Sequence, residues 1–235
     1  MMKAAPLPAI ILFMLSLVLN LWFAGGPDWR WVPAAAGGWY ITDLLSGLTH
    51  MYMDYRPCTP GVGLDEMFHY SGSRESAEYL ALRDRVLPRI SPFERLVYDF
   101  KNHHPRPEAL GRRSFMVQIG STILLVSLPF SILLNLLCLM LALPGWLIAG
   151  AVVLTIGGTL AQYFHGTLHR PENPWIVRTM RRIGLLMTPE AHALHHATLR
   201  RDFATNTGWS NPLVNAVFRV ATRRGWLTEA GLEPR

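Results

Sequence analysis

Long apolar stretches alternate with polar segments along the chain. Four stretches hold almost no charged side chain, and they cover residues 8–24, 34–53, 116–141 and 145–164. A helix of about 20 apolar residues crosses the ~30 Å hydrocarbon core of a bilayer, and each stretch reaches or nearly reaches that length. The pattern predicts an all-α integral membrane protein with about four transmembrane helices.

The stretches differ in how strongly they predict a span. The second is the weakest, because Gly37, Gly38, Asp43 and Gly47 interrupt its apolar run. The third and fourth are separated only by a turn near Pro144, so we expect them to form an antiparallel hairpin.

Composition supports the membrane class. Of 235 residues, 50% are hydrophobic and only 16% are charged, whereas soluble domains average about 25% charged residues. Two cysteines, Cys58 and Cys138, are too few for a disulfide framework or a four-thiolate iron–sulfur or zinc site. The formal charge of +6 fits basic residues gathered on one side of a membrane better than nucleic-acid binding.

The positive charges predict the orientation. With the amino terminus inside, the outer segments are residues 25–33 and the turn near 144, and they hold only Arg30 of the 22 Lys and Arg. The other 21 fall inside, which is the usual asymmetry of membrane proteins. The loop 54–113 and the tail 170–235 are therefore expected to form a cytoplasmic helical cap, with the spans in the inner membrane of a bacterium.

The rest of the chain offers few signs of further organisation. Without an internal repeat or a second domain, residues 1–235 are expected to form a single membrane-embedded domain. Lys3 ahead of an apolar stretch also fits a cleaved signal peptide over residues 1–24, which would leave the orientation unchanged. Residues 73–87 open with a cap-like Ser73 and predict an amphipathic helix on the membrane or against the tail.

Histidines gather where the apolar stretches end. The nine are His50, His69, His103, His104, His165, His169, His192, His195 and His196. All except His69 fall in four clusters at or beyond the inner ends of the second and fourth stretches. His165 and His169 are four residues apart, so both project from one helical face. His192, His195 and His196 again share one face at positions i, i+3 and i+4.

The two remaining clusters complete the set. His50 ends the second stretch, and the adjacent His103 and His104 would point about 100° apart on a helix, so this pair could serve two ions. Ahead of the last cluster, Thr188 and Pro189 predict an N-cap and the first residue of a helix.

The number of histidines points to metal. Imidazole is a good ligand for iron, copper, nickel or zinc, whereas eight neutral rings at a membrane edge would make a poor core and a poor surface. A zinc hydrolase needs three protein ligands, so eight histidines exceed one zinc site. They fit two octahedral metal ions with positions left open. His69 is expected to be an ordinary hydrogen-bonded or surface residue.

Two aspartates share the helical face of His50. Asp43 lies seven residues before it and Asp54 four residues after it. A carboxylate about 10 Å into the span costs roughly 2.5–3.5 kcal/mol on insertion scales and should be paired. Asp43 is expected either to orient a ligand imidazole or to be capped within a polar, glycine-lined packing site. Asp54 is expected beside the ligands or on the surface.

At these residues the chain resembles a lipid desaturase family, the Kua or CarF-type family, which includes plasmanylethanolamine desaturase. The similar segments are ITDLLSGLTH (41–50), KNHHPRP (101–107), QYFHGTLH (162–169), HALHH (192–196) and TGWSN (207–211), in the family's order. Each segment alone is weakly specific, and the ordered set is more so. Two departures stand out: Asp54 is followed by Tyr55 and an unusually long loop, and Ala204 stands where a cysteine is usual.

The resemblance implies a membrane desaturase with two iron ions held by the eight clustered histidines and dioxygen as co-substrate. It also implies a phospholipid substrate, either an alkyl chain that becomes a vinyl ether or an acyl chain. The headgroup phosphate is expected near Arg112, Arg113, Arg200 and Arg201.

The chain lacks a glycine-rich dinucleotide motif, so an external electron donor such as cytochrome b5 or ferredoxin is expected. Three alternatives stay open. A di-iron lipid hydroxylase would use the same ligands. A non-catalytic membrane haem-binding protein would need histidine pairs facing across helices. A membrane zinc hydrolase is disfavoured, because no HExxH segment occurs.

Overall fold

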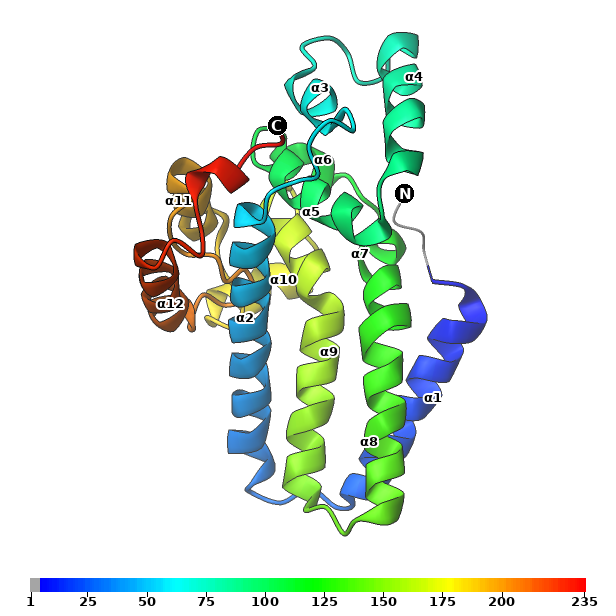
Figure 1. Cartoon of the computed structure of the whole chain (residues 1–235). Coiled ribbons are helices and arrows are strands. Elements are labelled where there is room, and N and C mark those ends of the chain that lie inside the picture. The colour runs from blue at the N-terminus through cyan, green and yellow to red at the C-terminus, as the bar shows by residue number, and fades with distance from the viewer. Residues whose placement is uncertain (1–4) are drawn as a thin grey trace.

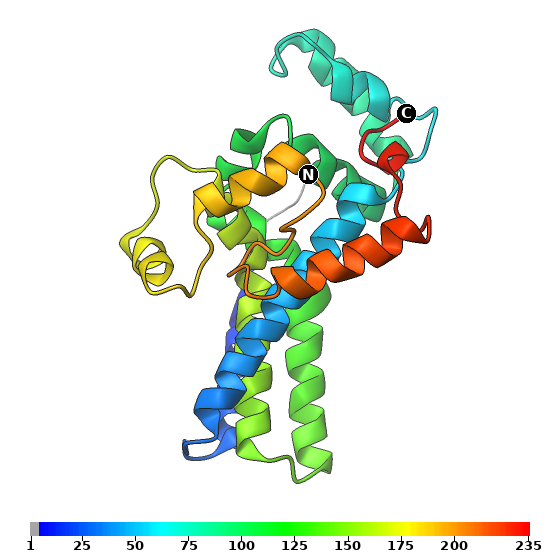
Figure 2. The same cartoon turned by 90° about the vertical axis from the view of Figure 1, so that its left-hand side faces the viewer.

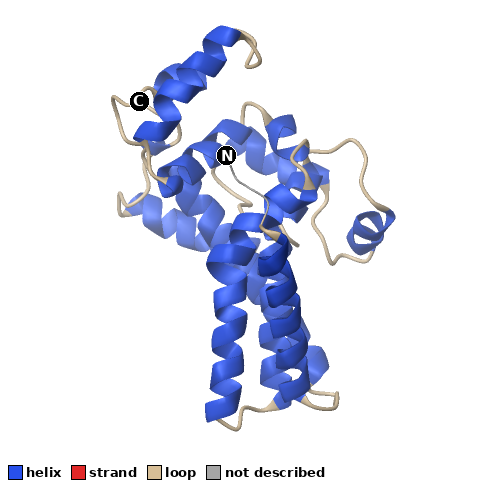
Figure 3. Ribbon diagram, turned by 90° about the vertical axis from the view of Figure 1, so that its right-hand side faces the viewer, coloured by secondary structure: helices blue, strands red, loops and turns tan. Residues whose placement is uncertain are grey.

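The computed structural model describes residues 5–235, and over this range the protein is built from helices joined by loops, without a strand (Figures 1 and 3). The main helices are α1 (Leu7–Ala24), α2 (Trp31–Tyr55), α5 (Pro92–His103), α7 (Phe115–Thr122), α8 (Leu128–Met140), α9 (Gly145–Leu168), α11 (Pro189–Thr198) and α12 (Asn211–Arg223). The all-helical expectation is confirmed. Lys3, on which the signal-peptide alternative depends, lies outside the described residues.

Within residues 5–235, three helical stretches are long and apolar enough to cross a membrane. They are α1, the continuous run Phe115–Met140, and α9. The middle run joins α7 to α8 through a π-helical turn, η2 (Ile123–Ser127). The fourth expected span corresponds to α2, which has 25 residues but does not reach the hydropathy of the other three. It runs beside α9 along the bundle (Figure 1).

Two of the glycines that weaken the apolar run of α2, Gly38 and Gly47, lie at its contacts with other elements. A Cβ at Gly38 would collide with the backbone oxygen of Gly150 on α9, and one at Gly157 would lie 2.7 Å from Oγ1 of Thr42. One at Gly47 would lie 2.9 Å from Cβ of Ala204. Gly38 and Gly47 lack side chains because other backbones approach them closely, and Gly157 leaves room for the side chain of Thr42.

The first helix is part of the bundle core. Its Asn20 donates to Oγ of Ser131 on α8 over 2.6 Å, and Asn135 of α8 donates to Oγ of Ser16 over 2.8 Å. Ser16 and Ser131 are themselves 2.7 Å apart. Polar side chains in an apolar bundle require such partners, so this buried cluster fixes α1 against α8.

The polar loop and tail cover one end of the bundle (Figures 1 and 2). The loop contributes the short helices α3 (Leu64–His69), α4 (Ala77–Val86), η1 (Leu87–Arg89) and α6 (Pro107–Gly111) besides α5. The tail contributes α10 (Trp175–Arg182), α11, α12 and η3 (Glu229–Gly231).

Helix α4 differs from the expectation in two respects. It is capped by Ser76, whose Oγ accepts from the Tyr79 backbone N–H, rather than by Ser73. It also lies at the end of the molecule farthest from the spans (Figure 1). There Tyr79 and Val86 pack with Leu64 and other apolar residues from 53–98, so the helix is covered by its own loop rather than by a membrane.

A buried lysine joins three segments of the cap. Lys101 is 1% exposed and its Nζ donates to the carbonyl oxygens of Met53 (3.1 Å), Asp54 and Gly231. The first two carbonyls belong to the end of α2, where unpaired carbonyls concentrate partial negative charge. Lys101 therefore ties α5 and the end of the tail to the end of α2.

Candidate metal centre

All eight clustered histidines meet in space at the cap end of the bundle. His50 comes from the last turns of α2, and His103 and His104 from the end of α5. The other five come from the end of α9 and from α11; they are His165, His169, His192, His195 and His196. Segments separated by up to 146 positions thus bring their imidazoles together.

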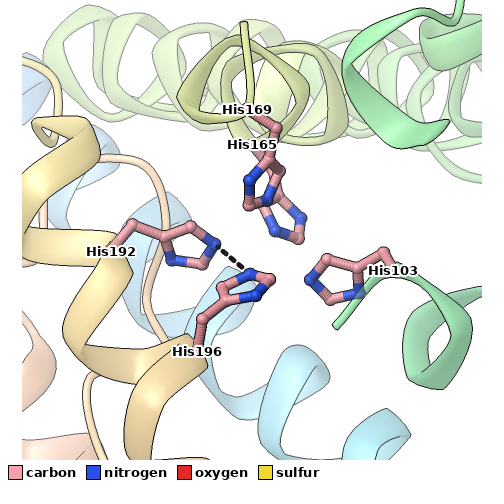
Figure 4. A group of neighbouring side chains, drawn as sticks. All are labelled: His103, His165, His169, His192 and His196. Carbon is pink, nitrogen blue, oxygen red and sulfur yellow. Dashed lines mark hydrogen bonds between the residues drawn. The ribbon is translucent and has the colours of Figure 1, made fainter. Parts of the chain in front are cut away.

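Five of the histidines form one group. His103 from α5 faces His165 and His169 from α9 and His192 and His196 from α11 (Figure 4). One nitrogen from each lies within 4.8 Å of the others. Nε2 of His196 and Nε2 of His192 are 3.2 Å apart. This group offers nitrogen ligands only.

The other three histidines form a second group with a carboxylate. Oδ2 of Asp54 lies 3.4 Å from Nε2 of both His50 and His195, and Oδ1 lies 3.5 Å from Nε2 of His104. Asp54 is 0% exposed. Asp54 was expected beside the ligands or on the surface, and it lies within the ligand group. The signal for this position is the four-residue spacing from His50, which puts both side chains on one helical face.

The two groups adjoin. The ring centres of His103 and His104 are 4.3 Å apart, and those of His50 and His165 are 4.9 Å apart. The adjacent pair His103 and His104 contributes one ring to each group, as their angular separation on a helix predicted. The arrangement has the form of two neighbouring sites of different composition.

Many of the converging atoms are buried without a hydrogen bond. These are the Nε2 atoms of His50, His103, His104, His165, His169 and His195 and both carboxylate oxygens of Asp54. An unpaired buried polar atom costs about 1–3 kcal/mol, so such a set is unfavourable unless a cation binds all of it. Imidazole nitrogens with one carboxylate suit iron, which accepts both ligand types. The residues therefore fit a metal pair.

Backbone carbonyls orient three of the rings. Nδ1 of His50 lies 3.0 Å from the Phe203 carbonyl oxygen, and Nδ1 of His195 lies 2.8 Å from that of Arg201. Nδ1 of His103 contacts the carbonyl of Phe100. When Nδ1–H donates to a carbonyl, Nε2 keeps its lone pair for a metal.

Asp43 has a different role from the orienting one expected of it. Its Oδ1 accepts from the backbone N–H groups of Thr207 (2.7 Å) and Gly208 (3.1 Å). Its Oδ2 accepts from the backbone N–H and the hydroxyl of Ser210, at 2.9 and 2.7 Å. Asp43 thus binds the TGWSN segment instead of an imidazole, which corrects the first expectation and agrees with the capped alternative.

Burial favours the neutral form of five of the clustered histidines. It lowers the pKa of His196 to about 3 and that of His169 to about 4, and the neighbouring imidazoles act in the same direction. Burial also lowers the pKa of His103, His104 and His192. Neutral imidazole is the form that binds metal.

The start of α11 follows the prediction, and its end does not follow from the sequence. Thr188 is the N-cap and accepts from the Ala191 N–H over 3.3 Å, with Pro189 as the first residue. The helix ends at Thr198, and its C-cap Leu199 has φ +53°, a left-handed conformation unusual for leucine. The Tyr55 hydroxyl donates to the Leu199 carbonyl over 2.9 Å and stabilises this turn, which presents the Arg201 carbonyl to His195.

His69 lies outside both groups. It is exposed, and its Nε2 is 3.9 Å from Oε2 of Glu233 on the surface. A cavity of about 20 Å³ lies beside His103 and His165, lined by residues of α5, α6 and α9 that include Leu110 and Gln162. That volume holds about one water-sized molecule.

Comparison with known proteins shows which family the chain resembles. A family model described as a lipid desaturase domain matches residues 93–227, which include seven of the eight clustered histidines. The chain is 27% identical to a plasmanylethanolamine desaturase from Myxococcus xanthus over 245 aligned positions, which cover 99% of this chain and 75% of the relative. No solved structure matches the chain significantly.

Proposed function

The chain belongs to the lipid desaturase family, and on that premise we propose that it is a membrane di-iron oxidoreductase. It introduces a double bond into a hydrocarbon chain of a membrane phospholipid and uses dioxygen as co-substrate. The observation that carries the proposal is the convergence of eight histidines and Asp54, whose buried ligand atoms make few hydrogen bonds.

Each group of side chains would hold one iron ion. His103, His165, His169, His192 and His196 form the all-nitrogen site, and His50, His104, His195 and Asp54 form the site with a carboxylate. Iron bound there would supply the redox chemistry with dioxygen that removes hydrogen from an unactivated methylene, which no side-chain acid or base can do. The protein's part is to hold the ligands, fix their rings through backbone carbonyls and keep bulk water away.

The overall reaction needs electrons from outside. Two adjacent methylenes lose two hydrogens, dioxygen becomes two water molecules, and the balance requires two further electrons and two protons. The sequence has two cysteines and no dinucleotide motif, so the electrons come from a separate carrier such as cytochrome b5 or ferredoxin.

The substrate is a membrane phospholipid. We extend to this chain the substrate class in the relative's name, plasmanylethanolamine, together with the acyl phospholipids that the resemblance implies. Desaturation of an alkyl chain next to its ether oxygen gives a vinyl ether, the bond of plasmalogens. Desaturation of an acyl chain gives an ordinary alkene.

The membrane arrangement follows from α2 and from charge. Helix α2 acts as the fourth span, because Asp43 is fully buried and hydrogen-bonded and because Gly38 and Gly47 pack closely against other elements. The cap lies on the cytoplasmic face of a bacterial inner membrane, since 21 of the 22 Lys and Arg lie on that side of the predicted topology. The whole chain works as one domain.

Metal analysis and product analysis test this function together. The detergent-purified protein should contain close to two irons per chain, and cells expressing it should accumulate a phospholipid two hydrogens lighter. His165→Ala should lose most of the metal and the product, whereas His69→Ala should keep both, because His69 lies outside the two groups. Stoichiometric zinc would overturn the assignment, and a product heavier by one oxygen would identify a hydroxylase.

A further inference from the structure

Helix α10 turns an apolar edge away from the protein. Trp175 is 70% exposed, Ile176 is 51% exposed and Ile183, just after the helix, is 64% exposed. The opposite side is held by the protein, since Val177 is buried with Phe164 and Leu186. Such exposure of large apolar side chains on a defined edge indicates a binding surface.

Helix α12 has the same character. Leu213, Val217 and Val220 are all exposed, and their spacings of four and three residues place them on one side of the helix. Val214 and Phe218 on the other side pack against α2. A shallow apolar hollow of about 300 Å³ lies on the exposed side. It is lined by Ala216, Val217, Val220, Ala221 and Trp226. The outward face is therefore an apolar stripe.

The charges around both faces have one sign. Residues 175–189 and 203–228 contain no Asp or Glu, and they hold six arginines: Arg178, Arg181, Arg182, Arg219, Arg223 and Arg224. The guanidinium of Arg224 lies 5.1 Å from the ring centre of Trp226. By contrast, the arginines first expected to meet a phosphate are partly neutralised, since Arg113, Arg200 and Arg201 pair with Asp99, Glu229 and Asp202.

The two helices lie at one level of the molecule. Both are found beside the cap-side halves of α2 and α9, and both run across the spans rather than along them (Figures 1 and 2). Trp39 of α2 donates to the Leu185 carbonyl over 3.1 Å, which fixes the segment after α10 to the bundle. Their outward faces thus meet whatever surrounds the ends of the spans.

We propose that α10 and α12 are interfacial helices that lie in the headgroup layer of an anionic phospholipid leaflet. Their apolar residues insert among the upper acyl carbons, and their arginines contact lipid phosphates. Exposed tryptophans beside arginines and the absence of acidic residues are the features of such helices. A protein partner would not require an acid-free surface on both helices.

The position of α11 follows from this arrangement. It lies between α10 and α12 along the chain and carries His192, His195 and His196. With both neighbours anchored in the headgroup layer, α11 is fixed just above the membrane surface. The proposal concerns the seating of the cap on lipid, and it holds whatever reaction the metal centre performs.

A fluorescence-depth experiment on the full-length protein tests the proposal. Single cysteines replace Ile176 and Val220, each in a Cys58→Ala, Cys138→Ala background, and carry an environment-sensitive fluorophore. Thr198→Cys on the exposed side of α11 and Leu80→Cys on α4 are matched controls. The protein is reconstituted in vesicles of phosphatidylcholine and phosphatidylglycerol, some of whose acyl chains carry a nitroxide quencher.

We expect quenching at positions 176 and 220 to exceed that at 198 and 80 about twofold or more, because only interfacial residues reach the acyl carbons. Pure phosphatidylcholine should reduce the excess, as should replacement of Arg178, Arg182, Arg219 and Arg223 by glutamine. Quenching equal to the controls would overturn the proposal. A second result would also overturn it: fluorophores that are shielded from water but not quenched by the lipid nitroxide, with a shielding that increases with the protein-to-lipid ratio. That result would show that a second copy of the protein, rather than lipid, covers these faces.

Discussion

At the scale of single residues, the two aspartates of α2 differ in their hydrogen bonding although both are fully buried. Asp43 accepts four hydrogen bonds from the 207–210 segment. Both oxygens of Asp54 make no hydrogen bond and face three imidazole nitrogens. A satisfied carboxylate stabilises the protein by itself, whereas an unsatisfied one needs a cation.

Asp54→Asn should weaken metal binding without weakening the metal-free protein. The amide keeps the shape but removes the negative charge that faces His50, His104 and His195, so we expect metal affinity to fall by more than the roughly 10–100-fold that loss of a supporting partner costs. Chelator competition measures the affinity, with Asp84→Asn on the exposed side of α4 as a control. Unchanged affinity would show that Asp54 is not a ligand.

Asp43→Asn, unlike Asp54→Asn, should destabilise the metal-free protein. The amide cannot accept from all four donors, and each buried donor left unpaired costs about 1–3 kcal/mol. We therefore expect a lower thermal unfolding midpoint in the metal-free protein as well as the metal-bound one. Metal affinity should also fall, because the displaced segment closely follows Phe203, whose carbonyl orients His50. Full stability of the metal-free variant would contradict this role.

At the scale of elements, the contact between α2 and α9 decides whether the ligands of both helices meet. Adjacent glycines on α2 differ there in a way that the sequence does not reveal. A Cβ at Gly38 would collide with the Gly150 backbone, whereas one at Gly37 would meet nothing within 4 Å. Close backbone approach through small residues is a common basis of helix pairing in membranes.

Gly38→Ala should therefore separate the two helices, and Gly37→Ala should not. We expect Gly38→Ala to lower the unfolding midpoint in detergent and to reduce the metal bound per chain, since His50 is on α2 and His165 on α9. Gly37→Ala is the matched control and should behave like the unaltered protein. Equal behaviour of the two variants would mean that the helices tolerate a shift at this crossing.

At the scale of the whole molecule, the sequence predicts what depends on length and spacing. Apolar length gave helices close to residues 8–24, 116–141 and 145–164, and the three- and four-residue spacings identified the histidines that converge. Helix α4 was predicted, over residues 73–87, whereas the short helix α3 was beyond the sequence because its stability comes from an apolar cluster with other segments of residues 53–98.

The composition of the site was equally beyond the sequence. Periodicity places His50 and Asp54 on one face, but it cannot tell that both face His195 of α11. Nor can it find the Phe203 and Arg201 carbonyls that orient the rings, since backbone atoms carry no signal of residue type. Pairings between elements come from packing, which a pattern along one chain does not specify.

Removal of the metal should loosen the cap and leave the bundle intact. The ligands join the ends of α2, α5 and α9 to α11, whereas α1 and α8 are joined by their own polar cluster. A metal present at about 100 times its dissociation constant contributes about 2.7 kcal/mol of stability, and chelation takes this away from the elements that carry ligands. Hydrogen exchange should then accelerate in residues 92–104 and 188–199 and stay unchanged in residues 128–140. Addition of ferrous iron should restore the protection from exchange. If chelation left the exchange rates of residues 92–104 and 188–199 unchanged, the cap would be held together without metal.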